Sequence, residues 1–183
     1  MHSSFSDARS DAHGQWHIRP LCMADLDGLM LVQVACYGSE YMESREIYRS
    51  RLTCPMQCSL VAVQDDVVIA YLAAYRSILG SVTPLHGEFA IHTHPDTLYL
   101  HDMAVRPDLA GLGLASSLLE AAWRAQDWSP LYSALVSVQG SQNYWQRKGY
   151  APQAQLTSPN AANLRTYGDD AVYMVRPYEV ARA

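Results

Sequence analysis

Apolar and polar positions along the first half of the chain fall into short runs with clear spacing. Trp16 to Leu21 alternates as a strand does, whereas 24–38 repeats apolar residues at helical spacing and stops at Gly38. A second helical stretch, 44–52, ends near Cys54-Pro55. The apolar positions of the first helix are Leu26, Leu29, Met30, Val34 and Tyr37.

The rest of the chain predicts two β-rich runs that meet at Gln64-Asp65-Asp66, a hairpin turn, and then a long loop over 79–97. Loops of that length are often functional. The elements expected after the loop are a strand 98–105, a helix from 114, a strand 131–138, a short helix 142–148 and strands near 150–154 and 171–177. Strands that alternate with helices, together with a hairpin, indicate an α/β or α+β domain with a mixed sheet.

Length and composition favour one domain over 16–183, preceded by a loose tail over 1–15. No apolar run is long enough to cross a membrane, so we expect a cytoplasmic protein without a membrane partner. The net charge of −5 argues against nucleic acid as a partner and is compatible with a cationic substrate. Four cysteines without paired metal-ligand spacing are expected to be reduced thiols.

Two glycines, Gly111 and Gly113, stand between the strand 98–105 and the helix that follows. Glycines let a ligand approach the unpaired N–H groups of a first helical turn, which favours an anion such as a pyrophosphate. The turn lacks the lysine and hydroxyl of a Walker A loop, and Ser116 replaces the third glycine of a dinucleotide fingerprint. A tight turn that binds nothing is the alternative.

The segment Val105 to Ala115, V-R-P-D-L-A-G-L-G-L-A, resembles the acyl-CoA motif of the GNAT superfamily of N-acetyltransferases, with Ala110 in place of the usual Arg or Gln. Tyr144 to Tyr150 is similar to the family's F-Y-x-K-x-G-F segment, and L-H-D-M-A-V resembles a bacterial subset. The resemblance covers nearly the whole chain. It implies a mixed, splayed central sheet of about seven strands flanked by about four helices.

The resemblance also implies acetyl-CoA as cosubstrate. The pyrophosphate is expected at the glycine turn, and the pantetheine arm beside the strand at Met103, whose N–H would face the thioester oxygen. The residues expected to contact the cofactor are Met103, Ala104, Val105, Ala110, Gly111, Leu112, Gly113, Leu114, Ala115, Ser116, Asn143 and Trp145.

Acetyl transfer requires that the acceptor ammonium lose a proton, and His101 is the expected base because a histidine in water titrates near neutral pH, with a pKa of about 6.5. The alternative is a half-buried strand residue bonded to the backbone. The family's acid tyrosine is Trp145 here, so Tyr99 is a speculative substitute. Asp102 should point to the other face of the strand and is expected to order a neighbouring loop or helix end.

Acceptor-binding residues are expected in the turn between the first two helices, at Tyr37, Glu40 and Tyr41, where rings and a carboxylate could hold a cation; a solvated turn is the alternative. His92, His94, His101 and Asp96 could suggest a metal, but Pro95 breaks the pattern, and no metal is expected.

The sequence thus predicts an acetyl-CoA-dependent N-acetyltransferase that acts on an amine of a small molecule or peptide, in which the amine attacks directly in a ternary complex. The alternatives are a CoA-binding sensor or partner-binding module without transfer activity, and a transferase for longer acyl chains. A homodimer is possible for a protein of this kind.

Overall fold

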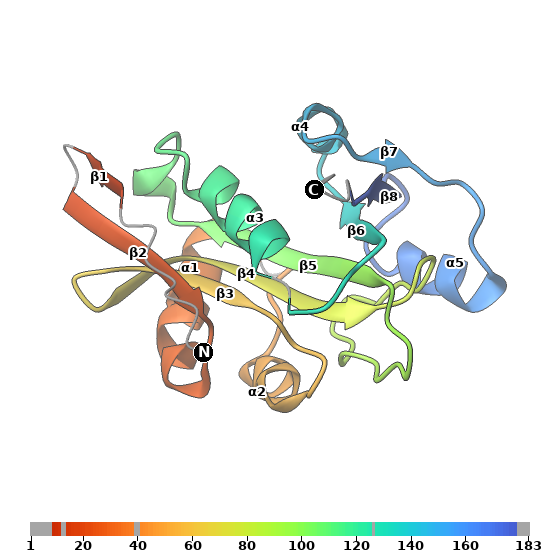
Figure 1. The fold of residues 1–183 in the computed structure, drawn as a ribbon, viewed down its shortest axis with the longest axis horizontal. Coiled ribbons are helices and arrows are strands. Elements are labelled where there is room, and N and C mark those ends of the chain that lie inside the picture. Colours follow the sequence, from red (N-terminus) through yellow and green to blue (C-terminus); the bar gives the residue numbers. More distant parts are fainter. Residues whose placement is uncertain (1–8, 12–13, 39–40, 126, 179–183) are drawn as a thin grey trace. The chain divides into compact units, whose positions relative to one another are not determined.

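A computed structural model describes residues 9–11, 14–38, 41–125 and 127–178 (Figure 1). Its elements alternate between strands and helices in the predicted way. In chain order they are β1 (Arg9–Asp11), β2 (Gly14–Pro20), η1 (Met23–Asp25), α1 (Leu26–Cys36), α2 (Arg45–Thr53), β3 (Leu60–Gln64), β4 (Val67–Ser77), β5 (Thr97–Val105), η2 (Pro107–Leu109), α3 (Leu114–Arg124), β6 (Tyr132–Ser137), α4 (Gln142–Arg147), β7 (Ala151–Pro152), α5 (Ser158–Arg165) and β8 (Val172–Pro177).

The strand order is β1-β2-β3-β4-β5-β6-β8-β7, so the described residues form eight strands of one mixed sheet where about seven were expected. A mixed sheet with flanking helices agrees with the predicted architecture. The described residues group into two compact units. Unit 1 comprises the described parts of Met1–Thr53, Cys58–Ala73 and Asp102–Gln126, and unit 2 comprises those of Cys54–Gln57, Ala74–His101 and Asp127–Ala183.

Unit 1 is an antiparallel ladder with helices on both faces. β2 pairs with β3 from Trp16–Gln64 to Pro20–Leu60, and β3 pairs with the start of β4. Asp65 and Asp66 both have positive φ, at 49° and 62°, which is the backbone of a tight hairpin turn of the primed type. In Figure 1, α1 and α2 lie on one face of this ladder and α3 on the other.

The buried face of α1 differs from the prediction. The helix buries Leu29 and Val32, whereas Val34 is 58% exposed. Gly28 explains the difference, because a Cβ at this position would lie 2.7 Å from Val68 Cγ2 on β4. The side of the helix that carries Gly28 therefore lies directly on the strand, and Val34 turns outward.

Unit 2 is built around β6, which pairs in parallel with β5 and antiparallel with β8. The β5–β6 register runs from Thr97–Tyr132 to Leu100–Leu135, and β5 continues to Val105. The long loop between β4 and β5 has no helix or strand, as predicted.

Two short elements were not predicted. Arg9–Asp11 pairs antiparallel with Gly14–Trp16, so these residues form a hairpin strand instead of a loose tail, while the tail positions 1–8 and 12–13 lie outside the described residues. Helix α5 follows Thr157 and has Pro159 in its first turn, a start signal that the sequence carries.

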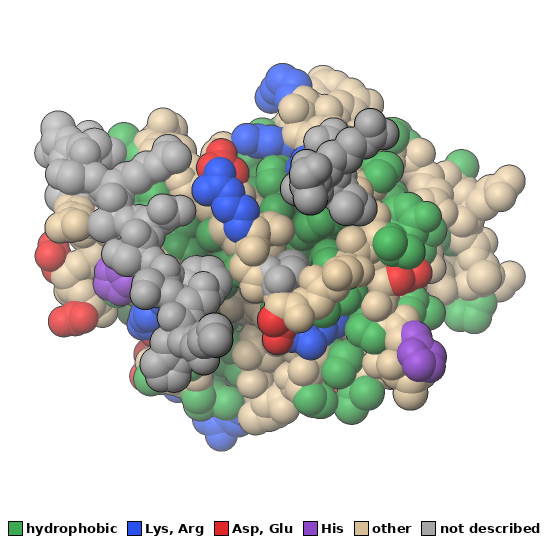
Figure 2. All heavy atoms as spheres, viewed as in Figure 1, with side chains coloured by type: hydrophobic (Ala, Val, Ile, Leu, Met, Phe, Trp, Pro, Cys, Tyr) green, Lys and Arg blue, Asp and Glu red, His purple; other side chains and the backbone are tan. Residues whose placement is uncertain are grey.

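Surface charge is mixed. Acidic and basic side chains are interspersed on the face drawn in Figure 2. Among the described residues, no helix is both long enough and apolar enough to span a membrane.

An ion pair between the partly exposed Arg19 and the buried Asp25 connects the end of β2 to η1, which precedes α1. Asp25 is 6% exposed and accepts bonds from Arg19 Nη1 at 2.7 Å and Nη2 at 2.6 Å. Burial raises the pKa of the Asp25 carboxyl, but the bonds from Arg19 and Cys22 outweigh it and the net pKa is lowered. Because the folded-state pKa is lowered, the contribution to stability is present above the unfolded-state pKa and is lost as the pH falls through the folded-state value.

We therefore predict that Asp25→Asn lowers the free energy of unfolding by about 1 kcal/mol at pH 7, and that the difference shrinks below pH of about 4. Urea denaturation at pH 7 and pH of about 3 measures both values. Asp27→Asn is the control, since Asp27 is 78% exposed in its pair with Arg45 and should change little. An equal loss for Asp25→Asn at both pH values would contradict the ion-pair account.

Candidate functional site

The turn from β5 into α3 in unit 1 has the backbone that the glycines predict. Gly111 and Gly113 have φ of 86° and 82°, in the left-handed region that favours glycine. Apart from the chain neighbours of each glycine, no heavy atom of the described residues lies within 4 Å of the position that a Cβ would take at Gly111 or Gly113. The turn is therefore open above both glycines.

Helix α3 begins directly behind this turn and buries an apolar face made of Leu114, Leu118, Leu119 and Ala122. Gly113 is its N-cap residue, and no side chain caps the helix. The first-turn N–H groups have no partner inside the helix, and the helix dipole places partial positive charge there. The arrangement suits the phosphates of a ligand.

The side chains beside the turn offer no obvious cation to such a ligand. Ala110 is exposed, with extended backbone at φ −62° and ψ 143°. The guanidinium of Arg106 bonds to Asp108 at 3.1 Å and 2.6 Å. Phosphate binding here would therefore rest mainly on backbone N–H groups.

The β5 backbone at Met103–Val105 is held by the end of α1. Cys36 Sγ donates to the Val105 carbonyl at 3.1 Å, and the Tyr37 hydroxyl lies 3.2 Å from the Met103 carbonyl. Burial, followed by the charge of Asp102, raises the pKa of the Cys36 thiol. The strand segment expected to flank pantetheine is thus fixed by two α1 contacts in unit 1.

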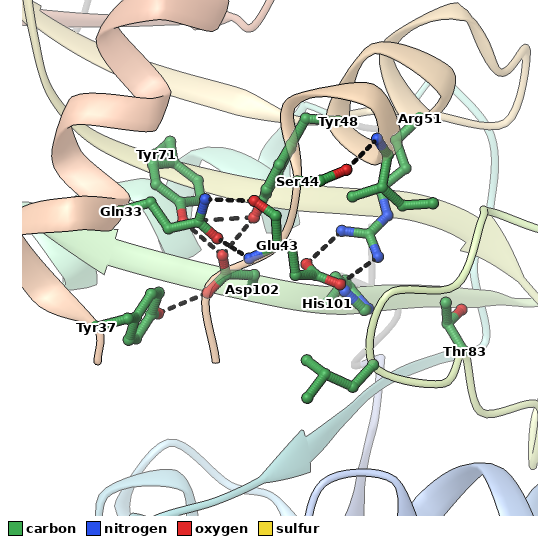
Figure 3. Close-up of polar contacts among 12 residues, drawn as sticks. Gln33, Tyr37, Glu43, Ser44, Tyr48, Arg51, Tyr71, Thr83, His101 and Asp102 are labelled. Atoms are coloured by element: carbon green, nitrogen blue, oxygen red, sulfur yellow. Dashed lines mark hydrogen bonds and ion pairs between the residues drawn. The ribbon is translucent and has the colours of Figure 1, made fainter. Parts of the chain in front are cut away.

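Asp102 is the centre of a polar cluster that the sequence analysis missed (Figure 3). Its Oδ1 accepts from Tyr37 at 2.6 Å, and its Oδ2 accepts from Tyr48 and Tyr71, each at 2.5 Å. We call Asp102, Tyr37, Tyr48 and Tyr71 the tyrosine–aspartate cluster. Its tyrosines come from the end of α1, from α2 and from β4, so no short-range sequence signal could have revealed it.

The three phenols are hydrogen-bond donors at neutral pH. Burial raises the pKa of Tyr48 and Tyr71, and the charge of Asp102 raises both further. Burial and then Asp102 also raise the pKa of Tyr37. The prediction that Asp102 orders a neighbouring helix end matches its bond to Tyr37, the C-cap residue of α1. Asp102 also bonds to Tyr48 inside α2.

A second buried cluster fixes the start of α2. Glu43 and Arg51 are each 2% exposed and form a two-bond ion pair, with the longer bond at 2.6 Å. The Gln33 side chain donates to the Glu43 carbonyl at 2.9 Å and accepts from the Glu43 N–H at 2.8 Å (Figure 3). The turn predicted to bind the acceptor is therefore anchored at Tyr37 on one side and at Glu43 on the other.

The three residues predicted to bind the acceptor differ in their surroundings in the structure. Tyr37 bonds to Asp102 and so belongs to the tyrosine–aspartate cluster. Tyr41 is half-buried. Glu40 lies outside the described residues.

His101, the predicted base, lies in unit 2 among aromatic rings. Its ring centroid is 5.7 Å from Phe89, 6.3 Å from Tyr99 and 6.3 Å from Tyr167. The Tyr167 hydroxyl donates its proton to the Thr83 carbonyl at 2.7 Å and lies 3.4 Å from His101 Nδ1. Because a phenol has one proton, this contact favours the tautomer with hydrogen on Nδ1 and the lone pair on Nε2.

Tyr99, the speculative acid, is fully buried in unit 2. Burial raises the pKa of its hydroxyl well above the ordinary value. A phenol enclosed in this way has no path to a leaving group in the described structure, so its burial argues against the acid role.

The loop between β4 and β5 is held by the region around α5. Asn160 Oδ1 accepts from the Val82 N–H at 2.8 Å, and Asn163 Nδ2 donates to the Val82 carbonyl at 2.7 Å. Further along, Thr166 Oγ1 accepts from the Leu85 N–H at 2.9 Å. The loop has a defined conformation that the unpredicted helix maintains.

The remaining predicted residues lie on α4 in unit 2. Asn143 is exposed, and Trp145 is half-buried with its ring edge-on to Tyr144 and Tyr150, at centroid distances of 5.0 and 5.5 Å. Among the histidines and acids once considered for a metal, Asp96 instead bonds to the Leu79 N–H and to Thr97. In the part of the chain that the structure describes, no three His, Cys, Asp or Glu residues gather as metal ligands.

Comparison with known proteins points to one family. The family model described as Acetyltransferase (GNAT) family matches residues 26–150, more than half of the chain. This range includes the glycine turn and the tyrosine–aspartate cluster. No curated protein sequence matches.

Solved structures share the fold at low sequence identity. The loading GNATL domain of CurA from Lyngbya majuscula superposes with a TM-score of 0.68 at 14% identity, covering 89% of this chain and 98% of that one. The PaiA N-acetyltransferase from Thermoplasma acidophilum, solved with coenzyme A, gives 0.61 at 16% identity and covers 89% and 99%. The GNAT-like decarboxylase GphF in complex with isobutyryl-CoA gives 0.67 at 16% and covers 89% and 100%.

Proposed function

Because this chain belongs to the GNAT acetyltransferase family, we propose that it transfers the acetyl group of acetyl-CoA to a primary amine of a small molecule or peptide. In this proposal the amine attacks directly in a ternary complex. The alternative is transfer of a longer acyl group from its CoA thioester.

The open glycine turn at the start of α3 carries the proposal. Gly111 and Gly113 combine left-handed backbone with unobstructed space, and the helix behind them lacks a side-chain cap. These features support binding of the CoA pyrophosphate by the N–H groups of Gly111–Ser116.

The pantetheine arm is proposed to lie along Met103–Val105, since an extended amide chain can hydrogen-bond to a strand edge. The Met103 N–H would then donate to the thioester oxygen as negative charge develops, and such a donor is worth about 3 kcal/mol in other enzymes. The bonds from Cys36 and Tyr37 to this strand support its rigidity.

The reaction needs one proton removed before attack. The ammonium gives up one proton to the base, and the neutral amine then forms a C–N bond to the acetyl carbon. As the C–S bond breaks to release CoA thiolate, the nitrogen loses its second proton to solvent or to the thiolate, which leaves a neutral amide. His101 is proposed as the base because it lies on β5, two residues before Met103. A thiolate is a fair leaving group without an acid, since a thiol pKa is about 8.5.

The finer expectations follow from the family and remain predictions: a place in the bacterial L-H-D-x-A-V subset, a cytoplasmic location, contacts of Asn143 and Trp145 with the cofactor, and a homodimer. The CoA-binding module without transfer activity is the competing function. Ala110 favours it, because this position lacks the side-chain donor of the usual motif.

The direct test is acetyl-CoA binding followed by thiol release. We predict that acetyl-CoA raises the melting temperature and that free CoA appears when a suitable amine is added from a panel of alkylamines, diamines, amino acids and peptides. Mass spectrometry of the acetylated amine confirms transfer. Absence of acetyl-CoA binding contradicts the proposal, binding without release across the panel favours the competing module, and competition among acyl-CoAs defines the chain length.

A matched pair of glycine variants tests the pyrophosphate site. Gly113→Ala and Gly80→Ala both place a Cβ at positive φ, 82° and 80°, in open space, so both should cost about 1–2 kcal/mol of stability. Only Gly113→Ala should weaken CoA binding, by about tenfold, through the loss of close backbone approach. Calorimetric titration with CoA measures the affinity of each variant. Equal CoA affinities in the two variants would contradict the assignment of the glycine turn to the pyrophosphate site.

A His101→Ala variant tests the base. It should keep CoA affinity and lose about 100-fold in rate at neutral pH. The rate of the variant should recover as the pH approaches the pKa of a free alkylamine, about 10, because more of the acceptor is then already deprotonated. Initial rates against pH with the best amine give the profile. If the variant and the unchanged protein have the same rate at every pH, His101 is not the base. Its role would then be to pack against Phe89, Tyr99 and Tyr167.

A further inference from the structure

Three carboxylates of unit 1, the buried Asp25 and Glu43 and the half-buried Asp102, have two different kinds of partner. Asp25 pairs with Arg19, and Glu43 pairs with Arg51. Asp102, by contrast, is bonded by phenols, and within the residues that the structure describes no Lys or Arg lies at ion-pair distance from it.

Three neutral donors orient a carboxylate but do not cancel its charge. An ionised group taken partly out of water remains costly unless a counter-charge is close. Arginine is the counter-charge at the other two acids of this unit. The tyrosine–aspartate cluster therefore carries a net negative charge that a ligand could complete.

The hydrogen-bond geometry leaves an acceptor position for that ligand. A carboxylate has about four lone-pair sites. Oδ2 accepts two bonds, from Tyr48 and Tyr71, whereas Oδ1 accepts one, from Tyr37. Tyr48 and Tyr71 are fully buried, whereas Asp102 is half-buried, so part of this residue is exposed to solvent.

The position of the cluster links this charge to the reaction. Asp102 directly precedes Met103, whose backbone is proposed to face the thioester. Tyr37 touches both residues, with its hydroxyl 2.6 Å from Asp102 Oδ1 and 3.2 Å from the Met103 carbonyl. A cation bound at Oδ1 would therefore lie next to the strand segment assigned to the acetyl donor.

We propose that Asp102 binds the acceptor amine as its ammonium ion and so restricts the acceptors of this protein to cationic amines. This inference rests on the proposed function for its biological meaning. The three tyrosines hold the carboxylate in place, and the ammonium donates a hydrogen bond to Oδ1.

Binding of a simple cation tests the inference without knowledge of the natural acceptor. n-Butylammonium chloride is titrated into isotopically labelled protein, with and without CoA, and 1-pentanol serves as the neutral analogue of similar shape. NaCl keeps the ionic strength constant. We expect saturable amide shifts at Asp102 and Met103 with the ammonium and none with the alcohol.

Three variants separate ligand binding from structural support. Asp102→Asn should weaken n-butylammonium binding by about tenfold or more while CoA affinity stays unchanged. Tyr71→Phe removes one buried donor but keeps the carboxylate, so it should lower the melting temperature and change ammonium affinity less than about threefold. Tyr37→Phe removes the hydroxyl that donates to Asp102 Oδ1 and should retain n-butylammonium binding.

Equal binding by Asp102→Asn, saturable binding of 1-pentanol, or shifts that sodium reproduces would each overturn the inference. If Asp102→Asn does not fold, the comparison of ammonium with alcohol in the unchanged protein still decides it. Failure of CoA to bind would count against the proposed function alone, because the titration without CoA tests Asp102 independently.

Discussion

The charge of Asp102 is the constraint on which the organisation of unit 1 depends. A carboxylate half-buried on a central strand needs donors, and it obtains them from Tyr37 at the end of α1, Tyr48 of α2 and Tyr71 of β4. These bonds attach two helices and a neighbouring strand to β5. The same strand then runs into the glycine turn and α3, so its position determines where both proposed ligands would bind.

The two proposed binding features use complementary electrostatics. The uncapped start of α3 presents N–H groups and partial positive charge, which suit the CoA phosphates. Asp102 presents negative charge, which suits an ammonium. Both belong to one continuous segment, Asp102–Ser116, and this continuity gives a physical reason for a cofactor anion and an acceptor cation to bind at fixed positions along the chain.

Local features could be predicted from the sequence, and long-range ones could not. The Gly111–Gly113 turn and the Asp65-Asp66 hairpin depend on the backbone of adjacent residues, and both were expected. Helix α5 carried a Thr157 and proline start signal that was overlooked. The partners of Asp102 come from three separate elements, and the packing of Gly28 on β4 rotates α1, so neither could be deduced from periodicity.

The most direct test of the central claim, that β5 and the start of α3 form the cofactor site, is an amide chemical-shift titration with CoA. The account predicts saturable shifts that concentrate at Met103–Val105 and at Gly111–Ser116. Saturable shifts confined to other parts of the chain, or no saturable shifts at all, would contradict it.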